Sequence, residues 1–84
     1  MTNIQSDGKY IIPLRMAGAG VRLRIISWRR GKGFTQKLLG IGLNVGSEIE
    51  VVQNDMHSPV LIFHNGTKLF LGGGMAQKIN VALI

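Results

Sequence analysis

The sequence predicts a mainly β protein: a small closed barrel of five to six short strands, with one short α-helix after the first main strand. Alternating apolar and polar residues recur along the chain, as half-buried strands require. Twelve glycines are scattered through 84 residues without a period, which is typical of tight turns between short strands. One segment changes to helical spacing. Closure of the sheet would remove exposed strand edges.

The first main strand is predicted at Val21–Trp28, where three apolar residues alternate with two arginines. The apolar segment Tyr10–Leu14 precedes it, is interrupted by Pro13, and is followed by a turn of small residues at 17–20. After the strand, Arg29–Gly33 contains two glycines and three cations and is predicted to be a loop.

A short helix is predicted at Phe34–Ile41, because Phe34, Leu38 and Ile41 recur at i, i+4 and i+7. Gly40 and Gly42 are expected to end it, since glycine readily adopts the left-handed conformation that follows a helix. A helix of about two turns is marginal alone, so packing must hold it.

The remaining elements are four short strands and one helical turn. Asn65-Gly66 predicts a tight hairpin, because both residues tolerate positive φ. The three glycines at 72–74 are expected to break the strand before them. The strands are predicted at Glu48–Gln53, Val60–Phe63, Lys68–Leu71 and Ile79–Leu83, and the helical turn at Met75–Lys78.

Length and composition allow one domain, predicted at residues 10–84 after a flexible N-terminal tail at 1–9. The chain has no cysteine, which excludes disulfides, cysteine-based metal centres and thiol nucleophiles, and favours a reducing compartment. The apolar runs are far shorter than the roughly 20 residues that span a bilayer, and no signal peptide is visible. A cytoplasmic location is therefore expected.

No group of residues in the sequence predicts catalysis or a cofactor. The four acidic residues and two histidines include no catalytic arrangement and no spaced metal-ligand set, so we expect no enzyme activity, no cofactor and no built metal site. Asp55-Met56-His57 and His64 offer at most weak chelation. The glycine-rich segments do not match the spacing of phosphate-binding loops and are interpreted as turns.

The segment Phe34–Val51, with its Gly40-Ile41-Gly42-Leu43-Asn44-Val45-Gly46 turn, resembles the FeoA family. The opening Pro13–Met16, the strand Gly20–Ile26 and the ending Leu69–Val81 follow the family order, so the resemblance covers Tyr10–Leu83. It implies a cytosolic SH3-like barrel that assists the FeoB ferrous-iron transporter. Lys37 departs from the arginine that is frequent in the family, and Gly72–Gly74 is looser than the family pattern.

The net charge of +6 permits an acidic protein partner, acidic lipid headgroups or a nucleic acid. A module that binds the transporter's cytosolic region is the first interpretation. A small basic barrel that binds RNA or DNA through Trp28–Gly33 is the alternative.

Activation of GTP hydrolysis, stabilisation of assembly and gating of the transporter are all open as modes of action. Leu39 could belong to the core or to the interface. The predicted partner-binding residues are Leu38 as first anchor, Leu39 as second, then Phe34 and Ile41, flanked by Lys37, Arg29, Arg30 and Lys32.

Overall fold

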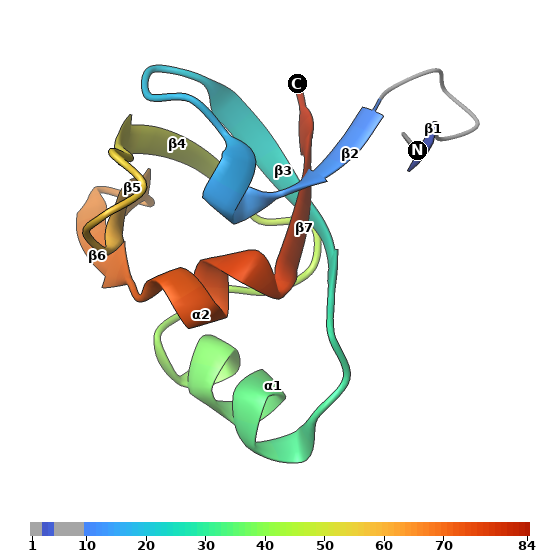
Figure 1. Cartoon of the computed structure of the whole chain (residues 1–84). Coiled ribbons are helices and arrows are strands. Elements are labelled where there is room, and N and C mark those ends of the chain that lie inside the picture. The colour runs from blue at the N-terminus through green and yellow to red at the C-terminus, as the bar shows by residue number, and fades with distance from the viewer. Residues whose placement is uncertain (1–2, 5–9) are drawn as a thin grey trace.

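Seven strands form one antiparallel sheet in the order β1-β2-β7-β3-β4-β5-β6 (Figure 1). The structure is a computed structural model that describes the backbone of residues 3–4 and all of residues 10–84. The strands are β1 (Asn3–Ile4), β2 (Tyr10–Pro13), β3 (Arg22–Trp28), β4 (Glu48–Gln53), β5 (Val60–His64), β6 (Thr67–Leu71) and β7 (Ile79–Leu83). The helices are the 3-10 helix η1 (Leu14–Met16), α1 (Lys32–Gly40) and α2 (Gly73–Gln77).

The predicted mainly β class is confirmed, with one strand more than the five to six expected. The extra strand is β1, whose two residues pair with β2. These two residues belong to the segment 1–9 that the sequence predicts to be a flexible tail. The rest of the segment lies outside the described residues.

The sheet curls strongly but does not close through a strand ladder in the described part of the chain. Register shifts between Ile25 and Ser27 and between Val51 and Gln53 bend it, because an extra residue on one strand increases local twist. β6 pairs with β5, and α2 then leads from β6 to β7 and packs against η1 (Figure 1). The closed barrel expected from the sequence is therefore open at β6.

The core lies inside the curled sheet and is wholly apolar among the described residues. Alternate residues of β3 and β4 point inward, so Leu23, Ile25, Ile49 and Val51 are buried. Leu14 from η1 fills the same cluster. No described polar or charged side chain is buried, so the core carries no desolvated polar group.

The end of α1 is fixed by backbone hydrogen bonds that need a glycine. Gly42 has φ +93° and donates its N–H to the Leu39 carbonyl at 3.0 Å. Leu43 donates to the Leu38 carbonyl at 3.0 Å. This pair of bonds is a Schellman motif, and the buried side chains of Leu38 and Leu43 supply its hydrophobic contact. The prediction that glycine ends the helix is confirmed, although the helix itself begins at Lys32 rather than Phe34.

The hairpin between β5 and β6 is also confirmed. Asn65 and Gly66 have φ of +49° and +79°, as a two-residue type I′ turn requires. The ladder then runs without a shift from His64 opposite Thr67 to Val60 opposite Leu71.

Gly73 lies at a crowded point where η1, α2 and the β4–β5 loop meet. The Arg15 guanidinium donates to the Met56 carbonyl at 2.5 Å and the Ser58 carbonyl at 3.3 Å. A Cβ on Gly73 would lie 2.9 Å from Arg15 Nη1. The middle glycine of 72–74 therefore leaves space for an arginine that ties the loop to the barrel.

Candidate partner-binding surface

α1 lies at one end of the molecule, beyond α2 and away from the sheet (Figure 1). Leu38 is fully buried and Phe34 packs partly against the core. Trp28 Nε1 donates to Thr35 Oγ1 at 3.1 Å, which joins the end of β3 to the helix. Lys78 places its Nζ 5.3 Å from the centre of the Phe34 ring, within cation–π range. These contacts hold a helix that is too short to be stable alone.

Three apolar side chains remain exposed within seven consecutive residues at the C-terminal end of α1. Leu39 is 49 % exposed, Ile41 38 % and Val45 55 %. We call this set the α1 surface. The sequence named Leu39 and Ile41 as partner-binding residues but missed Val45. The available signal was its position between Asn44 and Gly46, two residue types that are common in surface turns.

The sequence predicted Leu38 as the first partner anchor, but the structure places this residue in the core. Its side chain has no exposed surface, because the Schellman contact with Leu43 draws it into the core. Phe34 is likewise partly buried and lies beneath Lys78. The apolar stripe of α1 is thus core, and the additional leucine, Leu39, is at the surface.

Hydrogen bonds hold the turn that carries Val45. Asn44 Oδ1 accepts the Val45 N–H at 2.8 Å, and Ser47 Oγ accepts the Asn44 N–H at 3.0 Å. Ser47 also donates its N–H to the Asn44 carbonyl at 3.0 Å. A backbone held by these bonds has less conformational freedom to lose on binding, which favours a contact role.

Four exposed cations accompany the α1 surface: Arg29, Arg30, Lys32 and Lys37. We call them the basic rim. Residues 25–47 contain no carboxylate. Among the described residues, both ion pairs are made elsewhere, by Glu48 with Arg24 at 2.8 Å and with Arg22 at 3.7 Å. The basic rim therefore keeps an uncompensated positive potential that attracts negative charge.

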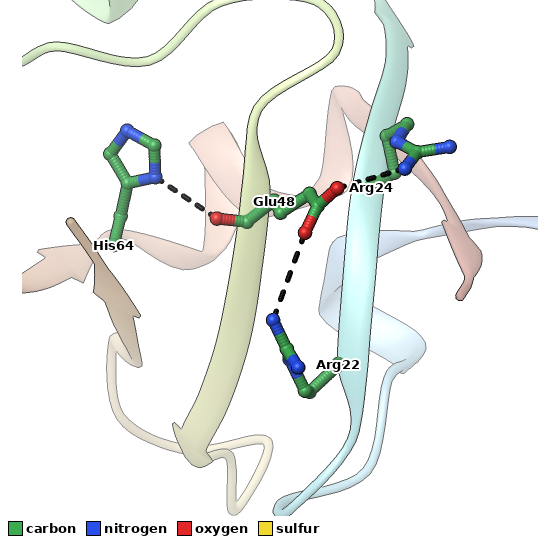
Figure 2. Close-up of polar contacts among 4 residues, drawn as sticks. All are labelled: Arg22, Arg24, Glu48 and His64. Carbon is green, nitrogen blue, oxygen red and sulfur yellow. Dashed lines mark hydrogen bonds and ion pairs between the residues drawn. The ribbon is translucent and has the colours of Figure 1, made fainter.

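Figure 2 shows that Glu48 pairs with both arginines of β3. The carboxylate lies between the two guanidinium groups. The hydrogen bond and charge of Arg24 lower the pKa of Glu48, and Arg22 adds to the effect against the opposing cost of desolvation. His64 Nδ1 donates to the Glu48 backbone carbonyl at 3.0 Å. The outer face of β3 and β4 is thus largely self-compensated, in contrast with the basic rim.

Trp28 does not present a free ring for base stacking. It is partly buried, packs against the core and donates its ring N–H to the Thr35 hydroxyl. Binding of single-stranded nucleic acid commonly uses exposed aromatic platforms, so the alternative function loses its stacking residue, whereas the three cations of Trp28–Gly33 stay exposed.

The loop Asp55–Ser58 holds its own carboxylate. Asp55 accepts the N–H groups of His57 and Ser58, both at 2.9 Å, and the Ser58 hydroxyl at 3.1 Å. These bonds lower the pKa of Asp55, the His57 N–H most. Within residues 3–4 and 10–84, no three acidic, histidine or cysteine side chains gather as metal ligands would.

A shallow groove of about 300 Å³ lies on the outer face of the sheet. Arg22, Glu48, Ile49, Glu50, Phe63 and Asn65 line it. Of its two carboxylates, Glu48 is engaged with arginines rather than with a base. In the described part of the chain, no helix is long and apolar enough to cross a membrane.

Comparison with known proteins identifies the family. The FeoA domain profile matches residues 12–83. The chain is 35 % identical over 69 residues to a protein named as an Fe(2+) transport protein A in Methanocaldococcus jannaschii, covering 82 % of this chain and 83 % of that protein.

Solved structures agree with this. The crystal structure of an iron uptake regulatory protein, FeoA, superposes with a TM-score of 0.83 at 27 % identity, covering 88 % of this chain and 99 % of that one. Iron(II) transport protein A from Clostridium thermocellum gives 0.79 at 27 % identity over 87 % of this chain and 46 % of that one. A manganese-dependent transcriptional repressor, at 16 % identity and a TM-score of 0.80 over 94 % of this chain and 47 % of that one, shares the fold alone. The protein has the SH3-like barrel expected from the sequence and belongs to the FeoA family, which is associated with ferrous-iron transport.

Proposed function

We propose that this protein is a cytosolic, non-enzymatic accessory protein of ferrous-iron uptake that binds the cytosolic region of a FeoB-type transporter. The observation that carries the proposal is the α1 surface beside the basic rim. Three exposed apolar side chains sit next to four cations, on a stretch of chain without a carboxylate. Family membership supports the process, and this surface supports a protein partner.

The two groups of residues serve different steps of binding. Apolar side chains at the centre of an interface supply most of the affinity, whereas charges at its edge steer association. Leu39 and Val45 are half exposed and offer the apolar centre. The basic rim selects an acidic surface on the transporter.

The test measures binding of the purified transporter cytosolic region to Leu39→Gln. Loss of a hot-spot anchor costs at least about 2 kcal/mol, a factor of roughly 30 in Kd. Val52→Gln is the matched control, because Val52 is a comparably exposed apolar residue on β4, at 38 %. We expect Leu39→Gln to weaken binding by that factor and Val52→Gln to leave it unchanged.

Charge reversal in the basic rim separates steering from anchoring. The double variant Arg30→Glu with Lys32→Glu should slow association and reduce its salt dependence more than it changes dissociation. Normal binding by Leu39→Gln, or equal loss in Val52→Gln, would remove the α1 surface from the interface. Tight, salt-sensitive binding of an oligonucleotide with no binding of the transporter region would favour the nucleic-acid alternative.

A further inference from the structure

β6 is an open edge of the sheet with an exposed aromatic residue. It is the last strand in the sheet order and pairs with β5 alone among the described strands. Phe70 on this strand is 70 % exposed, more than any other large apolar residue in the described chain. Open edges are usually protected by proline, bulges or several charges. The segment Thr67–Leu71 has a single lysine.

The hairpin determines which backbone groups point to the free edge. A two-residue turn makes the flanking pair, His64 and Thr67, a hydrogen-bonded pair. Bonding alternates along an antiparallel ladder, so Leu69 and Leu71 also face β5. The N–H and C=O groups of Lys68 and Phe70 therefore point away from the sheet. No hydrogen bond to other described elements engages them.

This arrangement is self-complementary about Leu69. When two copies of β6 pair antiparallel with the two-fold axis at Leu69, Lys68 lies opposite Phe70 of the second copy, and Phe70 opposite Lys68. These are the residues whose backbone groups are free, so a hydrogen-bonded pair forms on each side of the axis. Each lysine also meets an aromatic face, a favourable cation–π pair.

The neighbouring registers are less favourable. An axis at Lys68 places two ammonium groups opposite each other, which is destabilising. An axis at Phe70 pairs Lys68 with Gly72, whose carbonyl already accepts the Ala76 N–H at 2.9 Å. Charge and bonding together select the register about Leu69.

We propose that β6 is the interface of a symmetric dimer in which two copies of this chain join their sheets. On the outer face, Lys68 then lies between its own cross-strand neighbour Phe63 and Phe70 of the second copy. On the inner face, the partly buried Leu69 lies opposite Leu69 of the second copy. The dimer covers the sheet's exposed edge and its most exposed aromatic side chain.

This interface is separate from the α1 surface. β6 and α1 lie at different sides of the molecule in Figure 1, and the basic rim belongs to the β3–α1 segment. The net charge of +6 per chain opposes association, and salt screens that repulsion. The dimer therefore strengthens as ionic strength rises.

Sedimentation equilibrium from about 10 µM to about 1 mM at low and high salt tests the dimer. Phe70→Lys places lysine opposite Lys68 of the second copy, and we expect Kd to rise at least about tenfold, or about 1.4 kcal/mol. Adding Lys68→Glu to that variant places opposite charges across the axis and should restore the dimer. Val52→Lys, which adds the same charge to β4 away from the free edge, should have no effect.

Hydrogen exchange locates the contact. The amides of Thr67 and Leu69 are protected in the monomer by β5, whereas those of Lys68 and Phe70 should become protected only as concentration rises. A protein that stays monomeric across the range overturns the proposal. So does a dimer that is insensitive to Phe70→Lys, or one whose concentration-dependent protection appears on another strand or on α1.

Discussion

Adjacent leucines on α1 should respond in opposite ways to truncation. Leu38 has no exposed surface, whereas Leu39 is 49 % exposed. Leu→Ala in a core costs about 2–5 kcal/mol, and an 84-residue domain has a total stability of only about 4–13 kcal/mol. Leu38→Ala should therefore remove a large fraction of the free energy of unfolding. Leu39→Ala should change it by less than about 1 kcal/mol.

Urea denaturation followed by tryptophan fluorescence measures this difference. Trp28 is the single tryptophan and is hydrogen-bonded to Thr35 of α1, so its emission reports whether the helix is docked. With a slope near 1 kcal/mol per molar urea for a domain this small, Leu38→Ala should lower the midpoint by about 2 M or more.

Either of two results would contradict the placement of these leucines. A midpoint for Leu38→Ala within about 0.5 M of the unmodified protein would mean that the leucine is not in the core. An equal loss in Leu39→Ala would mean that the helix packs with a different face. The first result would return the choice of partner anchor to Leu38, and the second would remove Leu39 from the proposed interface.

Gly42→Ala should lose about 1–2 kcal/mol of stability, because φ is +93° at this position. Gly40 lies inside the helix with open space at its Cβ, so Gly40→Ala should gain up to about 1 kcal/mol. Thermal melting compares the two variants. The lowered pKa values of Glu48 and Asp55 give stability that is present above their ordinary pKa values of 4.5 and 3.8. That stability is lost as the pH falls through the lowered values, so the melting temperature should decrease when the pH is lowered past about 4. A variant with both carboxylates changed to amides should not show this decrease. Anaerobic calorimetry should show no stoichiometric binding of ferrous iron at about micromolar affinity or tighter; such binding, abolished by replacing a histidine, would contradict this.

The strands were predictable because one physical rule decided them. Leu23 and Ile25 alternate with arginines, and Ile49 and Val51 with glutamates, so only one face of each strand can enter the core. The Asn65-Gly66 turn followed from backbone sterics in the same way. The start of α1 could not be predicted from the sequence in this way. Gly33 disfavours a helix, yet the first helical bond, from the Thr35 N–H to the Gly31 carbonyl at 2.9 Å, forms ahead of the apolar stripe.

The candidate site was predictable as a region but not residue by residue. Helical spacing placed Leu38 on the core stripe, and the family resemblance drew it toward the interface at the same time. The buried contact with Leu43 resolves the conflict. Lys78 was missed altogether, because its position over Phe34 joins two segments that are far apart in the sequence and leaves no local signal.

The distribution of carboxylates connects the two proposed surfaces. Glu48 is engaged with Arg22 and Arg24, so the excess positive charge is concentrated at α1, where an acidic partner binds more weakly as salt screens attraction. Joining two copies through β6 brings like-charged molecules together, so that contact strengthens as salt screens repulsion. Opposite salt dependence therefore distinguishes the surfaces in one titration. If rising salt weakened both partner binding and dimerisation, one basic surface would serve both interactions.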